Sequence, residues 1–265
     1  MSYWLVQIIS TASDPALFTF LIGNQQGLPD IFTFIQEDNN HYLKVIDRNN
    51  QMTIKTVKEK VDDRLTFLNG NISFHLGVPG SLTRTGKIIY VDANGQRQGT
   101  STLTWSGRLG SRLPFPQSAT ARQPNFIETQ VIASKDPTVK RALQYYIDQP
   151  NWFSLFYIYE IIKKDYNQDR GKTNTRSFLS LPDAWVQDAT GRSREKDFTE
   201  SANNANLSGF AARHSYAKSD KIVPIDSHSV KVIKQNGKPE IIFPMNLNEA
   251  KTFIDKLLTE WLKSK

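Results

Sequence analysis

Two adjacent side chains that could act together in catalysis, Arg213 and His214, lie in the stretch SANNANLSGFAARHS, residues 201–215. A histidine titrates near neutral pH and can act as a general acid or base, and an arginine can hold an anion such as phosphate. We expect a helix here that Ser208 caps, with Phe210 on the face that the pair flanks. Arg213 and His214 are therefore the candidate catalytic residues.

Neutral hydrogen-bonding side chains precede the pair. The candidate ligand-binding residues are Asn203, Asn204 and Ser208. With Arg213 and His214, such a set can cut RNA without a metal ion, because the 2′-hydroxyl is an internal nucleophile. Two other interpretations stay open. One is ligand binding without catalysis, and the other is a structural pair in which Arg213 meets an acid, Glu160 or Glu200, and His214 meets a backbone carbonyl.

Other kinds of catalytic site find little support in the sequence. The chain has no cysteine and only four histidines, none at metal-binding spacing, so we expect neither a metal nor a cofactor. His41 and His75 are expected to be structural. The segment Gly171–Thr173 lacks the upstream glycine of a phosphate loop, and no Gly-x-Ser-x-Gly elbow is present.

Composition places the chain among globular proteins. It has 265 residues, 38% hydrophobic residues and a net charge of +7 that is spread along its length. No segment reaches the roughly 18 apolar residues that a membrane-spanning helix needs. We therefore expect a cytoplasmic protein with no membrane contact.

The first half alternates apolar and polar residues in short runs bounded by Asn, Asp and Gly, which is typical of β-hairpins. Segments 16–23, 30–36, 41–47, 52–57, 64–76, 86–105 and 126–133 are predicted to be strands or hairpins. Such spacing predicts an α+β protein whose residues 1–133 form an antiparallel β-sandwich or barrel.

The second half carries helix signals. Asp136 and Pro137 predict a helix start, residues 151–166 are apolar almost all round, and Asn246 with Glu249 forms a predicted capping box before an amphipathic stretch. Residues 134–265 are thus expected to form a mainly helical domain, with a small β-hairpin near 221–243.

Three segments of the second half, NWFSLFYIYEII, FTESANNANLSGFAARHS and PMNLNEAKTFIDKLLTEWL, resemble a pattern that recurs in an uncharacterised bacterial protein family. This half is also loosely similar to HEPN-type helical domains, small bundles found in RNases and in defence or toxin systems. The HEPN signature separates its arginine and histidine by about four residues, whereas Arg213 and His214 are contiguous.

These observations favour a non-enzymatic recognition or scaffold protein of a bacterial, phage-related or defence system, with a protein or RNA partner. The alternative, which the resemblance to HEPN domains implies, is a metal-independent ribonuclease that uses Arg213 and His214.

Overall fold

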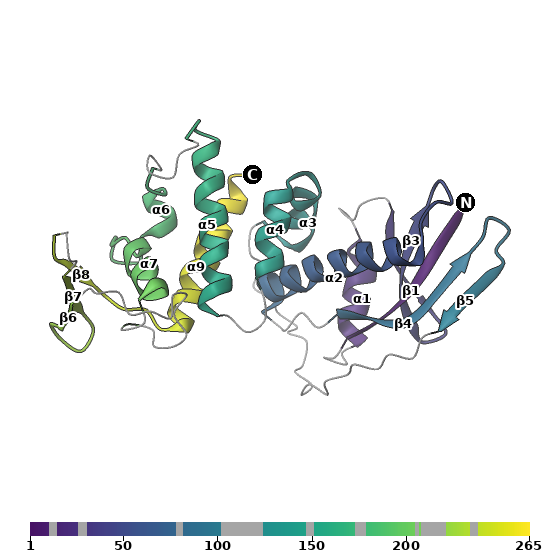
Figure 1. The fold of residues 1–265 in the computed structure, drawn as a ribbon, viewed down its shortest axis with the longest axis horizontal. Coiled ribbons are helices and arrows are strands. Elements are labelled where there is room, and N and C mark those ends of the chain that lie inside the picture. The colour runs from purple at the N-terminus through teal and green to yellow at the C-terminus, as the bar shows by residue number, and fades with distance from the viewer. Residues whose placement is uncertain are drawn as a thin grey trace. The chain divides into compact units, whose positions relative to one another are not determined.

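The computed structural model describes residues 1–10, 15–25, 31–77, 82–101, 124–146, 151–172, 179–204, 207, 221–233 and 238–265. These residues form an α+β structure that divides into two compact units, Met1–Asp148 and Gln149–Lys265 (Figure 1). The division follows residue 148 rather than residue 133, because the helices after residue 125 pack on a helix of the first unit.

Unit 1 contains a five-stranded antiparallel sheet with the strand order β2-β3-β1-β4-β5. Its strands are β1 (Ser2–Ser10), β2 (Phe32–Glu37), β3 (Asn40–Asp47), β4 (Leu82–Val91) and β5 (Arg97–Ser101). The hairpins β2–β3 and β4–β5 confirm two of the predicted ones. Their turns use Asp38, Asn39 and Gly95, all at positive φ, as tight hairpin turns require.

The predicted sandwich or barrel is wrong, because the described strands of unit 1 form one sheet that does not close. Several predicted strands are helices instead: α1 (Pro15–Gly23), α2 (Ile54–Leu76) and α3 (Phe126–Lys135). Helix α4 (Pro137–Tyr145) follows, capped by Asp136 with Pro137 in its first turn as predicted. The region before residue 133 is therefore a sheet with helices and not an all-β domain.

Helix α2 forms because its apolar residues recur with helical spacing, although the sequence also shows an alternation of apolar and polar residues that resembles strands. Val57, Val61, Leu65, Leu68 and Ile72 recur at steps of three and four residues, and all are buried. Thr53 caps the helix by accepting a hydrogen bond from the Thr56 amide.

Alternate residues of the strands point to two faces of the sheet, and α1 and α2 contact one of them, which we call the helix face. The Phe18 ring of α1 stacks on His41 of β3, with ring centroids 3.9 Å apart. Arg84 of β4 forms an ion pair with Asp62 of α2, and their closest atoms are 2.7 Å apart. The apolar side chains between these contacts form the core of unit 1: Val6, Ile8, Phe34, Leu43, Val45, Leu82 and Ile88.

The opposite side, which we call the inner face, carries Tyr3, Leu5, Gln7, Ile35, Glu37, Tyr42, Lys44, Lys87, Ile89, Val91 and Arg97. Arg97 of β5 and Glu37 of β2 form an ion pair with a separation of 3.0 Å, although their strands are the opposite edges of the sheet. The sheet must therefore curl towards this face. The curl explains why Leu5, Tyr42 and Val91 form a small buried cluster there.

Helices α3 and α4 pack on the side of α2 that faces away from the sheet. The contact with α3 is partly polar, since His75 hydrogen-bonds Thr129 at 2.9 Å and the buried Arg64 donates to the Gln130 side chain at 2.8 Å. Burial lowers the pKa of Arg64 to about 9. His75 is thus buried and structural, as predicted, although it lies on a helix rather than a strand.

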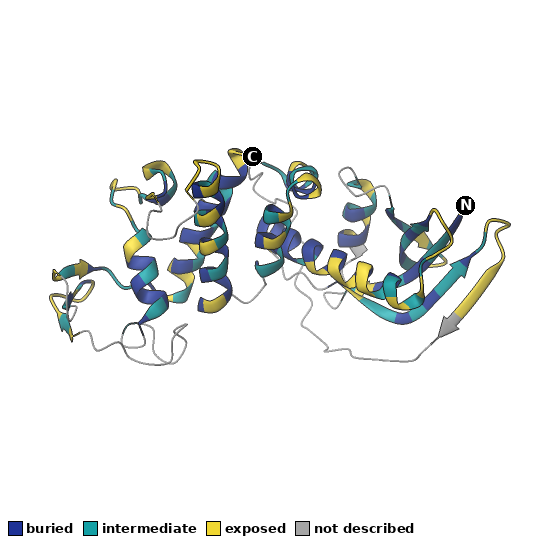
Figure 2. Ribbon diagram, turned by 45° about the horizontal axis from the view of Figure 1, so that its top comes forward, coloured by how far each residue is buried: buried dark blue, intermediate teal, exposed yellow. Residues whose placement is uncertain are grey.

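Unit 2 is mainly helical, as predicted. Its helices are α5 (Trp152–Gln168), α6 (Asp183–Val186), α7 (Glu195–Asn203) and α9 (Leu247–Lys263), and a small sheet joins β6 (Lys221–Pro224), β7 (Val230–Ile233) and β8 (Glu240–Ile242). The predicted hairpin near 221–243 is therefore a three-stranded sheet. The buried residues of α5 and α9 are dark blue in Figure 2. Between these helices, Phe198 of α7 contacts the rings of Phe156 of α5 and Phe253 of α9.

The contact between α2 and α4 yields a stability prediction. A Cβ atom added to Gly70 would lie 1.7 Å from the Leu143 backbone oxygen. Because backbone cannot move aside cheaply, we expect Gly70→Ala to lower the free energy of unfolding by about 1–3 kcal/mol in urea denaturation. Gly23→Ala, at a helical glycine with nothing within 4 Å, is the control and should be neutral or slightly stabilising. Equal effects of the two changes would contradict this account.

Candidate functional site

Only some of the predicted catalytic and ligand-binding residues are among those that the structure describes. Arg213, His214 and Ser208 lie outside the described residues, so their roles stay predictions. Asn203 ends α7 and Asn204 follows it. Of the two acids considered as partners for Arg213, Glu200 is buried on α7 and Glu160 is exposed on α5.

The two asparagines point into the protein rather than to solvent. Asn203 donates to the Thr199 carbonyl at 2.9 Å, and its own Oδ1 atom is buried without a hydrogen bond. Asn204 is fully buried. The ligand-binding roles of Asn203 and Asn204 stay predictions.

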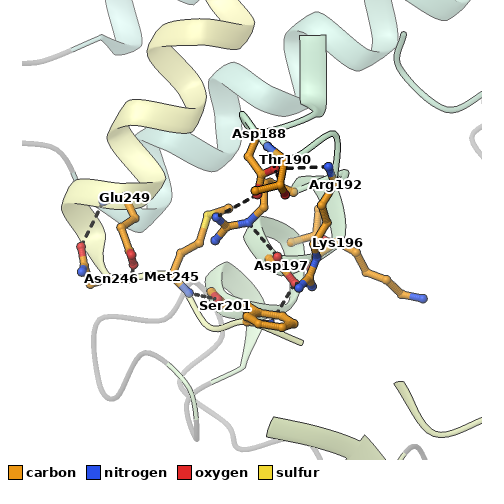
Figure 3. Close-up of polar contacts among 12 residues, drawn as sticks. Asp188, Thr190, Arg192, Lys196, Asp197, Ser201, Met245, Asn246 and Glu249 are labelled. Carbon is orange, nitrogen blue, oxygen red and sulfur yellow. Dashed lines mark hydrogen bonds and ion pairs between the residues drawn. The ribbon is translucent and has the colours of Figure 1, made fainter. Parts of the chain in front are cut away.

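Beside these asparagines, α7 carries a dense polar network centred on Asp197 (Figure 3). The Asp197 carboxylate is 1% exposed and accepts hydrogen bonds from Arg192 at 2.9 Å and from Arg194 at 2.8 Å. The Phe243 backbone N–H donates to the same carboxylate at 3.0 Å. A buried carboxylate with this many donors fixes the segments that supply them.

The loop before α7 presents both arginines in a defined conformation. Asp188 accepts from the amides of Thr190 and Arg192, and Gly191 adopts φ 80° in the turn between them. The Thr190 hydroxyl also donates to Asp188, and these hydrogen bonds lower the pKa of the Asp188 carboxyl. The Arg192 guanidinium lies 3.6 Å from the centre of the Phe243 ring.

This network is suited to holding segments together. Ser201 of α7 accepts a hydrogen bond from the Met245 amide at 2.8 Å, directly before the capping box of Asn246 and Glu249 that begins α9 (Figure 3). The Asp197 carboxylate is buried and holds three donors of the protein itself, which suits a structural role. We interpret the network as the structural joint between α7 and α9.

A second polar cluster links α5 to α7. The buried Tyr159 hydroxyl donates to Glu195 at 2.7 Å, and the Lys163 ammonium lies 2.7 Å from the same carboxylate oxygen. Burial, followed by the neighbouring Glu195 charge, raises the pKa of Tyr159. The phenol therefore stays protonated at physiological pH, and the cluster supplies no phenolate for acid–base chemistry.

Metal and membrane sites are also absent from what the structure describes. The described ranges contain no group of three His, Asp or Glu side chains that could hold a metal ion. Among the helices that are described, none is both long and apolar enough to cross a bilayer.

The inner face of unit 1 offers a different kind of site. Lys44 of β3 and Lys87 of β4 lie on the two sides of β1, and both are partly exposed. The Lys44 ammonium is 4.1 Å from the centre of the Tyr3 ring, and the Lys87 ammonium is 5.8 Å from the centre of the Tyr42 ring. In the described part of the chain, neither ammonium has a carboxylate partner.

The charge on this face is unbalanced. Glu37 is the one acidic side chain that the described strands direct to it, and Glu37 is already paired with Arg97. The hydrogen bond from Arg97 to Glu37 raises the pKa of the Arg97 guanidinium. The face therefore presents the uncompensated charges of Lys44 and Lys87 around aromatic and apolar side chains.

Sequence analysis did not identify this set. Tyr3, Lys44 and Lys87 come from three strands, and the pairing of β1 with both β3 and β4 brings them together. The alternation of Tyr42 with Lys44 is visible in the sequence, but the partner strands are not.

Comparison with known proteins adds no assignment. No protein-family model matches the chain, and searches of curated proteins and of solved structures found no match.

The joint around Asp197 leads to a second prediction. Asp197→Ala leaves two arginines and the Phe243 amide without their shared acceptor, so we expect a loss of about 3–5 kcal/mol in the free energy of unfolding of unit 2. Urea denaturation followed by tryptophan fluorescence, to which Trp152, Trp185 and Trp261 of unit 2 contribute, measures this. The exposed Asp169→Ala is the control and should change stability by less than about 0.5 kcal/mol. A mild effect of Asp197→Ala would show that the joint is dispensable.

Proposed function

We propose that the chain is a recognition module without catalytic activity, and that the inner face of unit 1 binds a negatively charged partner. The observation that carries this proposal is the pair Lys44 and Lys87, partly exposed cations on the two strands that flank β1, which have no acid among the described residues. A site that leaves cations unpaired favours an anion from outside the chain.

The architecture supports a binding role in two ways. The lysines stand on strands of a hydrogen-bonded sheet that α1 and α2 brace from the helix face, so binding does not have to order them. In the two polar clusters of α7, the carboxylates of Asp197 and Glu195 are paired with donors of the protein itself. Recognition thus accounts for the two lysines of the inner face.

The expected setting, a bacterial, phage-related or defence system with a protein or RNA partner, stays a prediction. So does the alternative function, a metal-independent ribonuclease centred on Arg213 and His214. The two functions differ in turnover, which allows one experiment to separate them.

The proposal predicts a salt-sensitive interaction with polyanions. We expect the full chain to bind fluorescein-labelled polyglutamate or single-stranded oligonucleotides in fluorescence anisotropy, with affinity that falls between 50 and 200 mM salt. Lys44→Gln combined with Lys87→Gln should weaken binding at least tenfold. The control is Lys58→Gln combined with Lys60→Gln on α2, which removes the same charge away from the inner face and should change affinity less than twofold.

Two results would overturn the proposal. One is equal loss of affinity in the inner-face and control variants, which would mean that net charge alone attracts polyanions. The other is cleavage of single-stranded RNA in EDTA that disappears in folded His214→Ala, which would favour the ribonuclease.

A further inference from the structure

The inner face combines cations with an aromatic ring and side-chain amides, and we infer that its partner is a single-stranded nucleic acid. This inference rests on the proposed function and narrows the anionic partner to one class. Single-stranded nucleic acid offers phosphates, stacking bases and hydrogen-bonding base edges together, and each has a counterpart on this face.

The phosphate contacts fall to Lys44 and Lys87. Their strands flank β1, so their backbones are two strand spacings apart, about 10 Å. Flexible lysine side chains can reach successive phosphates of one strand across that distance. Arg97 adds a third cation at the edge of the face, although Glu37 already compensates it.

Tyr3 provides the stacking surface. Tyr3 is partly exposed, and the Lys44 ammonium lies over its ring at 4.1 Å from the ring centre. When a base stacks on Tyr3, this ammonium can swing to the adjacent phosphate, because the lysine stem has four rotatable bonds. Tyr42 is buried and cannot stack in the same way, but Ile35 and Ile89 offer apolar contact on either side of the buried cluster.

An amide network borders the same face and suits base edges. Gln7 donates to the Asn40 side chain at 2.8 Å and accepts from the Thr85 hydroxyl at 2.9 Å. Amides carry both donors and acceptors, as base edges do, whereas an acidic peptide side chain needs only donors. This difference favours a nucleic acid over an acidic protein segment.

The inference also distinguishes one strand from two. In a double helix the bases are stacked inside and the phosphates lie outside, so the lysines would find partners but Tyr3 would find no free base. The curl of the sheet, which the Arg97–Glu37 ion pair joins edge to edge, further favours a thin and flexible ligand.

The test compares ligands and Tyr3 variants in the full chain. We expect fluorescein-labelled 12-nucleotide single strands, of RNA or DNA, to bind at least tenfold more tightly than the matching duplexes and than polyglutamate of equal charge. Tyr3→Leu should weaken single-strand binding about tenfold, and Tyr3→Phe should retain it, because phenylalanine keeps the stacking surface. Loss of Lys44 and Lys87 should also reduce the slope of log K against log salt by about 1.4.

The outcomes separate the inference from the proposed function. Equal affinity for single strands, duplexes and polyglutamate, with dependence on the two lysines, would overturn the nucleic-acid assignment and leave an anion-binding module. Binding that is insensitive to Tyr3→Leu, with the variant folded by circular dichroism, would overturn the assignment as well. Absence of lysine-dependent binding to any of the three ligands would overturn both.

Discussion

Helix α2 is the element on which the arrangement of unit 1 depends, and its close contact with α4 is the tightest constraint on it. One side of α2 meets β4, and another side meets α3 and α4. The approach is possible only because Gly70 has no side chain opposite the Leu143 carbonyl oxygen. Helices α1 and α2 cover the helix face of the sheet. The side chains of the inner face are instead brought together by the curl of the sheet.

The curl of the sheet brings charged, aromatic and apolar side chains of the inner face close to one another. The edge strands meet through Arg97 and Glu37, and a small cluster around Leu5 becomes buried although the described residues place no second sheet over it. Long side chains such as Lys44 lie over tyrosine rings, so that the apolar stems cover the cluster while the charge stays near solvent. The same packing that stabilises the sheet thus sets out the groups that recognition would use.

Local signals in the sequence predicted the structure correctly at two helix caps and one tight turn. The capping box of Asn246 and Glu249, the Asp136–Pro137 start and the β4–β5 turn at Gly95 all agree with the structure. Asn125 with Glu128 was an equally clear signal for α3, but the strand-like composition of residues 126–133 led to the prediction of a strand.

In α2, the sequence Asn69-Gly70 led to the prediction of a hairpin turn. Their actual roles are tertiary, because Asn69 bonds the backbone of Leu82 and Gly70 admits a neighbouring helix, and no local pattern reports that. The inner-face site was unpredictable for a related reason, since it depends on strand order.

The shared carboxylate of Asp197 has a consequence for local motion in unit 2. It accepts one bond from a main-chain amide, that of Phe243, and the others from the arginine side chains of a separate loop. The Phe243 amide proton can therefore exchange with deuterated solvent only when the segment before α9 comes away from α7. Its exchange rate therefore reports how often this part of the molecule opens.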